Sequence, residues 1–146
     1  MPTDLAADTA AMAAQLRLSA TRLARRLRQE AGSGLTPSQL SALAAVHNNG
    51  PLTLGELADH ERVAPPSISK CVAKLEADGL LARAPDPNDG RISRVSTTKA
   101  GRALVAEARR RKTAWLTGRI EELDDDDRAR LAAALDVLDR LHGDPR

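Results

Sequence analysis

The sequence predicts a mainly helical fold with one small β-hairpin, an α+β fold in which the helices dominate. Apolar residues recur at spacings of three, four and seven near both ends of the chain, which is typical of one face of a helix. Between them lie two short segments with helix-capping residues, followed by two strand-like segments around an Asp-Gly turn. A length of 146 residues suits one domain, so we expect residues 1–146 to form a single domain.

A long helix is expected first, over residues 4–31, and it ends at the Gly-Ser-Gly stretch of residues 32–34. Its apolar stripe consists of Leu5, Met12, Leu16, Leu23 and Leu27. The second helix begins after Thr36, because Thr is a good N-cap and Pro37 suits the first helical position. It stops at the Asn-Asn-Gly sequence of residues 48–50.

Two shorter helices follow in the middle of the chain. Thr53 caps a helix over residues 54–60, because Glu56 stands three residues later and completes a capping box. A tight turn at residues 62–64 leads into a fourth helix over residues 65–79, which one of its two leading prolines opens. The inner face of this helix consists of Ile68, Cys71, Val72 and Leu75.

The predicted hairpin consists of strands over residues 80–84 and 92–97, with an Asp-Gly turn at residues 89–90 between them. A threonine at position 97 or 98 then caps a fifth helix over residues 99–119. The final helix is expected over residues 124–142. Its stripe consists of Leu131, Leu135, Leu138 and Leu141. Four consecutive Asp residues at its start complement the positive end of the helix dipole.

Two adjacent helices with a tight turn, followed at once by a basic hairpin, are the arrangement of a winged helix-turn-helix. In such a motif the second helix lies in the major groove of DNA, and its N-terminal residues reach the base edges. Ser and Lys side chains can bond bases or phosphates, and Pro offers apolar contact to a thymine methyl group. The candidate DNA-binding residues on this helix are Pro65, Pro66, Ser67, Ser69, Lys70 and Lys74.

The hairpin offers a second DNA contact through its arginines. The minor groove is narrow and strongly negative, which suits an Arg carried on a thin arm, and Arg91 follows directly after the turn. Arg83 and Arg94 lie nearer the strand ends and suit phosphate contacts. The alternative interpretation is a solvated hairpin whose charges protect a strand edge.

Charge is unevenly distributed, although the formal net charge is only +2. Residues 17–30 carry a net charge of +4 and residues 99–112 a net charge of +5, whereas residues 121–127 hold six acidic side chains and no basic one. This segregation indicates one positive and one negative face. Aromatic residues make up 1% of the chain, which argues against binding of single strands by base stacking.

Other classes of protein are disfavoured. A single cysteine rules out an intramolecular disulfide, and the N-terminus lacks the basic residues of a signal peptide. The longest uncharged run, residues 31–55, is too polar for a membrane span, so we expect a cytoplasmic protein. The three histidines are not spaced as a metal site, and no nucleophile elbow or phosphate loop is present. We therefore expect neither enzymatic activity nor a cofactor.

The sequence resembles the MarR (multiple antibiotic resistance regulator) family of bacterial transcription factors. The segments that carry the resemblance are TLGELA (53–58), SISKCV (67–72), LEADGLLAR (75–83) and DGRISRVSTT (89–98). The family's wing signature is Asp-x-Arg with Val four residues after the Arg, and then x-Leu-Thr. This chain keeps Asp89, Arg91, Val95 and Thr98 but has Thr97 where Leu is usual. The difference affects the argument for packing of the wing on the core, not the DNA role of the wing.

The resemblance implies a homodimeric repressor of transcription. The terminal helices, residues 4–31 and 124–142, would interlock with those of a second copy, and helix 99–119 would link them to a DNA-binding lobe over residues 36–98. Two such lobes would bind a palindromic operator in double-stranded DNA. The resemblance also implies a small lipophilic or phenolic effector, whose contact residues in this sequence are unknown.

Two further implications concern single residues. The resemblance implies that Asp89 pairs with an arginine to hold the wing, which leaves Arg91 for the minor groove. Cys71 invites a second interpretation, an oxidant sensor of the same fold, although its inward position favours a buried apolar role. A third interpretation is a helical interaction module that does not bind DNA.

Overall fold

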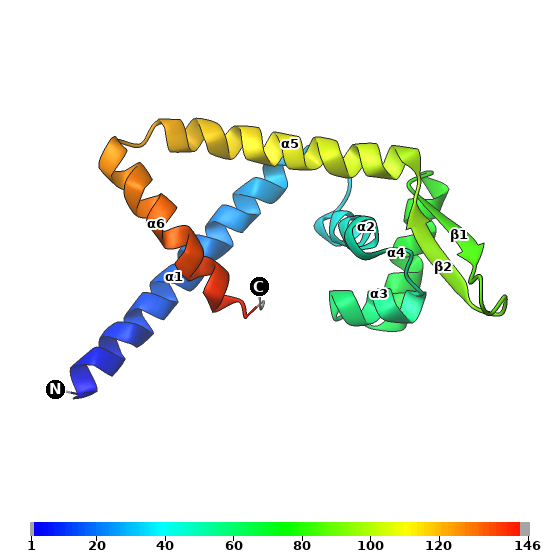
Figure 1. Cartoon of the computed structure of the whole chain (residues 1–146), viewed down its shortest axis with the longest axis horizontal. Coiled ribbons are helices and arrows are strands. Elements are labelled where there is room, and N and C mark those ends of the chain that lie inside the picture. The colour runs from blue at the N-terminus through cyan, green and yellow to red at the C-terminus, as the bar shows by residue number, and fades with distance from the viewer. Residues whose placement is uncertain (1, 144–146) are drawn as a thin grey trace. The chain divides into compact units, whose positions relative to one another are not determined.

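A computed structural model describes residues 2–143, including the side chains of residues 7–143. Its elements in chain order are α1 (Pro2–Glu30), α2 (Pro37–Asn49), α3 (Leu54–Glu61), α4 (Pro65–Ala77), β1 (Leu81–Pro85), β2 (Ser93–Thr97), α5 (Lys99–Glu121) and α6 (Asp125–Leu141) (Figure 1). The predicted fold class is confirmed, and element ends differ from the predicted ones by one or two residues, as fraying ends commonly do. The side chain of Leu5, in the predicted stripe of α1, lies outside the described ones.

The chain divides into two compact units, Met1–Lys112 and Thr113–Arg146. The core of the first unit lies where α2, α3, α4 and the two strands contact one another. Its largest fully buried side chains are Leu43, Val46, Leu57, Leu75, Val72, Val95 and Val105. Because α2, α3 and α4 share this core, the outer faces of α3 and α4 remain open to solvent.

Helix starts follow the predicted capping residues. The Thr36 side chain accepts a hydrogen bond from the Gln39 amide at 3.2 Å, and the Gln39 side chain accepts one from the Thr36 amide at 3.1 Å. The predicted box of Thr53 and Glu56 forms in the same way at the start of α3. At the start of α5 the cap is Thr98, whose hydroxyl oxygen accepts from the Gly101 amide at 3.0 Å.

Two close contacts tie α5 to the hairpin. The Thr98 hydroxyl donates to the Gly79 carbonyl oxygen at 2.6 Å. Gly101 is buried, and a Cβ atom there would collide with the carbonyl oxygen of Leu80, so only glycine lets α5 approach this closely. The base of the hairpin is therefore joined directly to the first turn of α5.

The hairpin is an antiparallel pair in which Leu81 lies opposite Thr97 and Pro85 opposite Ser93. Leu52 adds a short bridge on the other side of β2, with two backbone hydrogen bonds to Val95 at 2.7 and 3.0 Å. At the base of the wing β2 therefore has two neighbours, β1 on one side and Leu52 on the other. The segment before α3, which contains Leu52, anchors the wing.

Two helices expose apolar side chains. In α1 the exposed large ones are Met12, Leu16, Leu18 and Leu23. In α6, which belongs to the second unit, they are Leu135, Val137, Leu138 and Leu141, and none of the described residues of this helix is buried. Among residues 2–143 no helix combines the length and hydropathy needed to cross a bilayer.

Candidate nucleic-acid interface

The helix-turn-helix forms where the sequence predicts it. α3 ends at Glu61, and Arg62 turns the chain with a left-handed φ of 56°, which leads into α4 at Pro65. The inward side chains of α4 are Ile68, Val72 and Leu75, all buried. The predicted contact residues Pro65, Pro66, Ser67, Ser69, Lys70 and Lys74 are all exposed. The N-terminal part of α4 therefore presents small polar and basic groups outward on a rigid helix.

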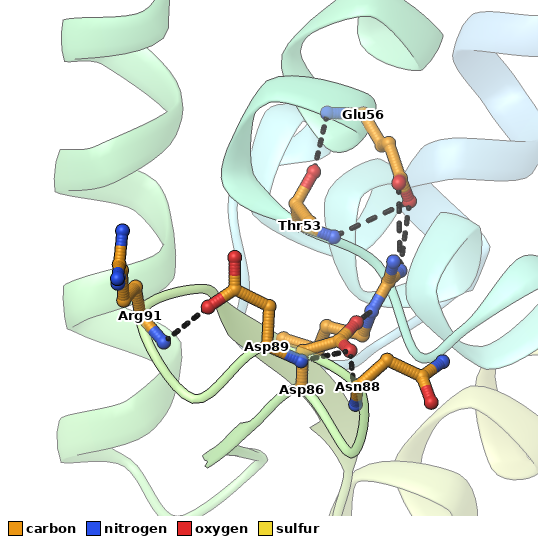
Figure 2. A network of polar contacts seen from close by, with 7 residues as sticks. Thr53, Glu56, Asp86, Asn88, Asp89 and Arg91 are labelled. Atoms are coloured by element: carbon orange, nitrogen blue, oxygen red, sulfur yellow. Dashed lines mark hydrogen bonds and ion pairs between the residues drawn. The ribbon is translucent and has the colours of Figure 1, made fainter.

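The wing loop is organised by aspartate side chains (Figure 2). One carboxylate oxygen of Asp86 accepts the backbone amides of Asn88 at 2.8 Å and Asp89 at 3.2 Å. The Asp89 carboxylate in turn accepts the Arg91 amide at 3.0 Å. These turns hold the loop by its backbone, so the Arg91 side chain is left exposed.

Arg94 lies at the base of the wing and is engaged on two sides. Its Nε donates to the second carboxylate oxygen of Asp86, and its Nη1 lies 3.3 and 3.4 Å from the two carboxylate oxygens of Glu56. The Arg94 side chain is 31% exposed and that of Asp86 only 9%. Glu56 is also part of the capping box of α3, so this network ties the wing to the helix-turn-helix.

Some charged side chains of α4 and the wing form ion pairs within the chain, and others do not. Arg83 forms an ion pair with Glu76 at 2.6 Å, and Lys74 forms one with Asp78 at 3.1 Å. Among the side chains that the structure describes, residues 7–143, those of Arg91 and Lys70 make no hydrogen bond or ion pair. An external anion can therefore reach these two cations without breaking an internal contact.

The chain is similar to known proteins in its sequence and its fold. The model of the MarR family matches residues 35–93, from the start of α2 to the wing. The HTH-type transcriptional regulator Mb0904 of Mycobacterium bovis is 42% identical over 130 residues, which cover 88% of this chain and 91% of that protein. The chain belongs to the MarR family. Its relatives are transcriptional regulators, and it shares their winged helix-turn-helix.

Solved structures agree with this assignment. A protein of Pseudomonas aeruginosa described as a transcriptional regulator is 36% identical, with a TM-score of 0.83 over 94% of this chain and 98% of that one. A mutant of MepR from Staphylococcus aureus, solved bound to an oligodeoxyribonucleotide, has the same fold. Its TM-score is 0.68 and its identity 20%, with 89% of this chain and 97% of that one covered.

One expectation drawn from the MarR resemblance differs from the structure. The arginine and carboxylate that close the wing are Arg94 and Asp86, whereas the Asp89 carboxylate accepts a backbone amide. Arg94 was expected to suit phosphate contacts, yet Asp86 and Glu56 already engage its guanidinium. Sequence reasoning missed Asp86, although an Asp followed by Pro-Asn-Asp is a recognisable side-chain-to-backbone turn.

The groups around Asp86 stabilise the ionised form of its carboxyl. The hydrogen bond from Arg94, followed by that from the Asn88 amide, lowers the pKa of Asp86, and the same bond raises the pKa of Arg94. A carboxyl with a lowered pKa contributes stability above its unfolded pKa, about 3.9, and loses that contribution as pH falls through the folded value. The wing should therefore loosen only in strongly acidic solution.

Replacing Asp86 with asparagine is expected to loosen the wing, because the amide carries no charge for Arg94. Amide hydrogen exchange at Asn88 and Asp89 should accelerate, and affinity for operator DNA should fall by about 2- to 10-fold, the range for one lost hydrogen bond. Asp89→Asn is the matched control, since an Asn oxygen still accepts the Arg91 amide. If Asp89→Asn lowered operator affinity more than Asp86→Asn, the assignment of Asp86 as the carboxylate that closes the wing would be contradicted.

Two cavities lie away from the wing, each lined by described residues of the first unit. The first has a volume of about 770 Å³, and basic groups and apolar side chains from α1, the start of α2 and α5 line it. Its basic lining residues are Arg25, Arg28 and Lys112. The second, of about 540 Å³, lies against the inner side of α4. Arg28, Pro37 and Ser41 line both cavities, so the two adjoin.

Cys71 lies at the second cavity and is half-buried. Its Sγ lies 4.0 Å from the Ser38 carbonyl oxygen. Burial, and to a smaller extent the charge of Glu61, raises the pKa of the Cys71 thiol. A raised pKa lowers the thiolate fraction at neutral pH, and the thiolate is the form that oxidants attack.

Proposed function

We propose that this MarR family regulator binds double-stranded DNA as a homodimer and represses transcription from an inverted-repeat operator until an effector releases it. The observation that carries the proposal is the joint exposure of the α4 N-terminus and of Arg91, whose guanidinium has no partner among the described side chains. Both belong to one lobe that shares a core, so they can contact one duplex together.

Major-groove and minor-groove contacts would divide between the two elements. Ser67, Ser69 and Lys70 suit base edges and phosphates in the major groove. Two prolines remove amide donors from the first turn of α4, so side chains must supply phosphate contacts there. Arg91 would enter the minor groove from the wing. Lys74 and Arg83 would reach phosphates only by sharing their charge with Asp78 and Glu76.

A second copy of the chain is the proposed partner of α1 and α6. Met12 is 69% exposed in α1 and Leu141 64% in α6, and each belongs to a set of exposed apolar side chains on its own helix. Contiguous apolar surface marks an interaction site, and on each helix these side chains would form such a surface. The oligonucleotide complex of the MepR mutant supports a DNA-binding role for this fold. Two lobes related by a two-fold axis would match an inverted repeat.

The first cavity is the proposed effector site. Arg25, Arg28 and Lys112 offer three cations, and Leu35 and Leu40 add an apolar wall. This combination suits a lipophilic or aromatic molecule with a carboxylate or phenolate group. Such a molecule can release DNA only if it binds the non-binding arrangement of the lobes more tightly than the binding one.

Fluorescence anisotropy with a duplex from the region upstream of the protein's own gene tests this function. The affinity should fall steeply as salt rises, since each phosphate contact releases counterions, and a shuffled duplex should bind more weakly. Equal, salt-independent binding to both duplexes would favour a helical interaction module that does not use DNA.

Hydrogen peroxide is expected to leave operator affinity unchanged, both in the parent protein and in Cys71→Ser. The reason is the raised pKa of the Cys71 thiol, which keeps it protonated. Anisotropy before and after peroxide treatment measures this. A loss of affinity in the parent that Cys71→Ser abolishes would favour the oxidant sensor instead.

A further inference from the structure

One hydrogen bond joins the cavity wall to the helix-turn-helix. The Ser41 hydroxyl, on α2, donates to a carboxylate oxygen of Glu61 at 2.8 Å. Ser41 lines both cavities, whereas Glu61 lines only the second. A molecule in the first cavity therefore lies against the residue whose hydroxyl holds Glu61.

Glu61 stands at a sensitive point of the fold. It is the last residue of α3, and the left-handed turn at Arg62 follows it directly and leads into α4. Glu61 is also half-buried, so its position is constrained by its neighbours. A shift of this side chain would therefore reach the turn that sets the direction of the recognition helix.

A second hydrogen bond between α2 and α3 provides a comparison. The Asn49 side-chain amide lies 3.2 Å from Nε2 of His60, near the other end of α2. Neither residue lines either cavity. Of these two bonds, only that of Ser41 and Glu61 is within reach of a bound effector.

We propose that the bond between Ser41 and Glu61 holds the recognition helix in its DNA-binding position, and that an anion in the first cavity acts by taking the Ser41 hydroxyl. A serine hydroxyl has one donor hydrogen, so it cannot serve Glu61 and a ligand carboxylate at once. The released Glu61 carboxylate would also face the ligand's like charge. This inference rests on the DNA binding and effector site proposed above, and it makes Ser41 and Glu61 positioning residues.

A double-mutant cycle on DNA affinity tests the positioning role without a ligand. Ser41→Ala and Glu61→Met, which keeps the length of the side chain but has no acceptor oxygen, should each weaken operator binding by about 2- to 10-fold, the worth of one hydrogen bond. The double variant should bind operator DNA no more weakly than the single variant with the lower affinity, because both substitutions remove the same interaction. Ser41→Thr keeps the hydroxyl and should restore parent affinity. The salt dependence should not change in any variant, since no phosphate contact is lost.

Salicylate serves as the probe for the ligand step. Salicylate should weaken operator binding of the parent protein and of Asn49→Ala, the control variant. It should not lower the operator affinity of Ser41→Ala any further. Additive effects in the cycle, or parent-like affinity of Ser41→Ala, would overturn the positioning role. A full salicylate response in Ser41→Ala would overturn the ligand step. A parent that neither binds salicylate nor responds to it would contradict the effector site instead, and the cycle would then decide the role of Ser41 by itself.

Discussion

Replacing Arg91 with alanine is expected to weaken binding of operator DNA by about 1–3 kcal/mol, the range for a good groove contact. The guanidinium has no partner among the side chains of residues 7–143, so its removal breaks no contact that the structure describes. Stability should therefore change by about 0.5 kcal/mol or less, as for most exposed substitutions. Anisotropy titrations and urea unfolding measure the two quantities separately.

Arg130→Ala is the matched control for this prediction. The Arg130 side chain is 81% exposed on α6, and its Nη1 lies 3.4 Å from a carboxylate oxygen of Asp127. Removing it changes the net charge by the same amount without touching the wing. If a folded, dimeric Arg91→Ala variant bound DNA as tightly as Arg130→Ala, the proposal that the wing contacts DNA through Arg91 would be contradicted.

Leu135→Glu is expected to convert the protein into a monomer. Leu135 lies in the apolar stripe of α6 and is 54% exposed in the single chain, so the proposed dimer would bury it. Burying a carboxylate without a partner costs several kcal/mol. Because the two lobes act together on one operator, loss of the dimer should weaken DNA binding by roughly 10²-fold or more.

Ala133→Glu places the same charge on the other side of α6. Two residues along a helix correspond to a rotation of about 200°, so position 133 faces away from Leu135. This variant should remain dimeric and bind DNA as the parent does. Analytical ultracentrifugation gives the masses, and a dimeric Leu135→Glu would contradict the proposed interface.

Local signals in the sequence were sufficient for the order of the elements. Periodic leucines, the threonine caps at positions 36 and 53, and the Asp-Gly turn each act over a few residues, so they could be recognised without tertiary structure. The exposed N-terminus of α4 followed from the same periodicity, because Ile68 and Val72 mark its inner face.

Long-range partners could not be predicted from the same signals. Arg94 has Glu56 as a partner 38 residues earlier in the chain, so its charge alone did not reveal that it is engaged. The choice between Asp86 and Asp89 depends on which carboxylate the opposite strand brings to Arg94. The first cavity likewise combines residues from α1, α2 and α5, and no local pattern links those segments.

Hydroxyl-radical footprinting on the upstream duplex, with the parent and Arg91→Ala side by side, tests the central claim most directly. We expect two symmetric protected half-sites about 10–10.5 base pairs apart from centre to centre, or a multiple of that spacing. Protection in the minor groove at the outer edge of each half-site should disappear in Arg91→Ala. A single unsymmetric footprint, or minor-groove protection that Arg91→Ala leaves unchanged, would contradict a dimer that reads DNA through its wings.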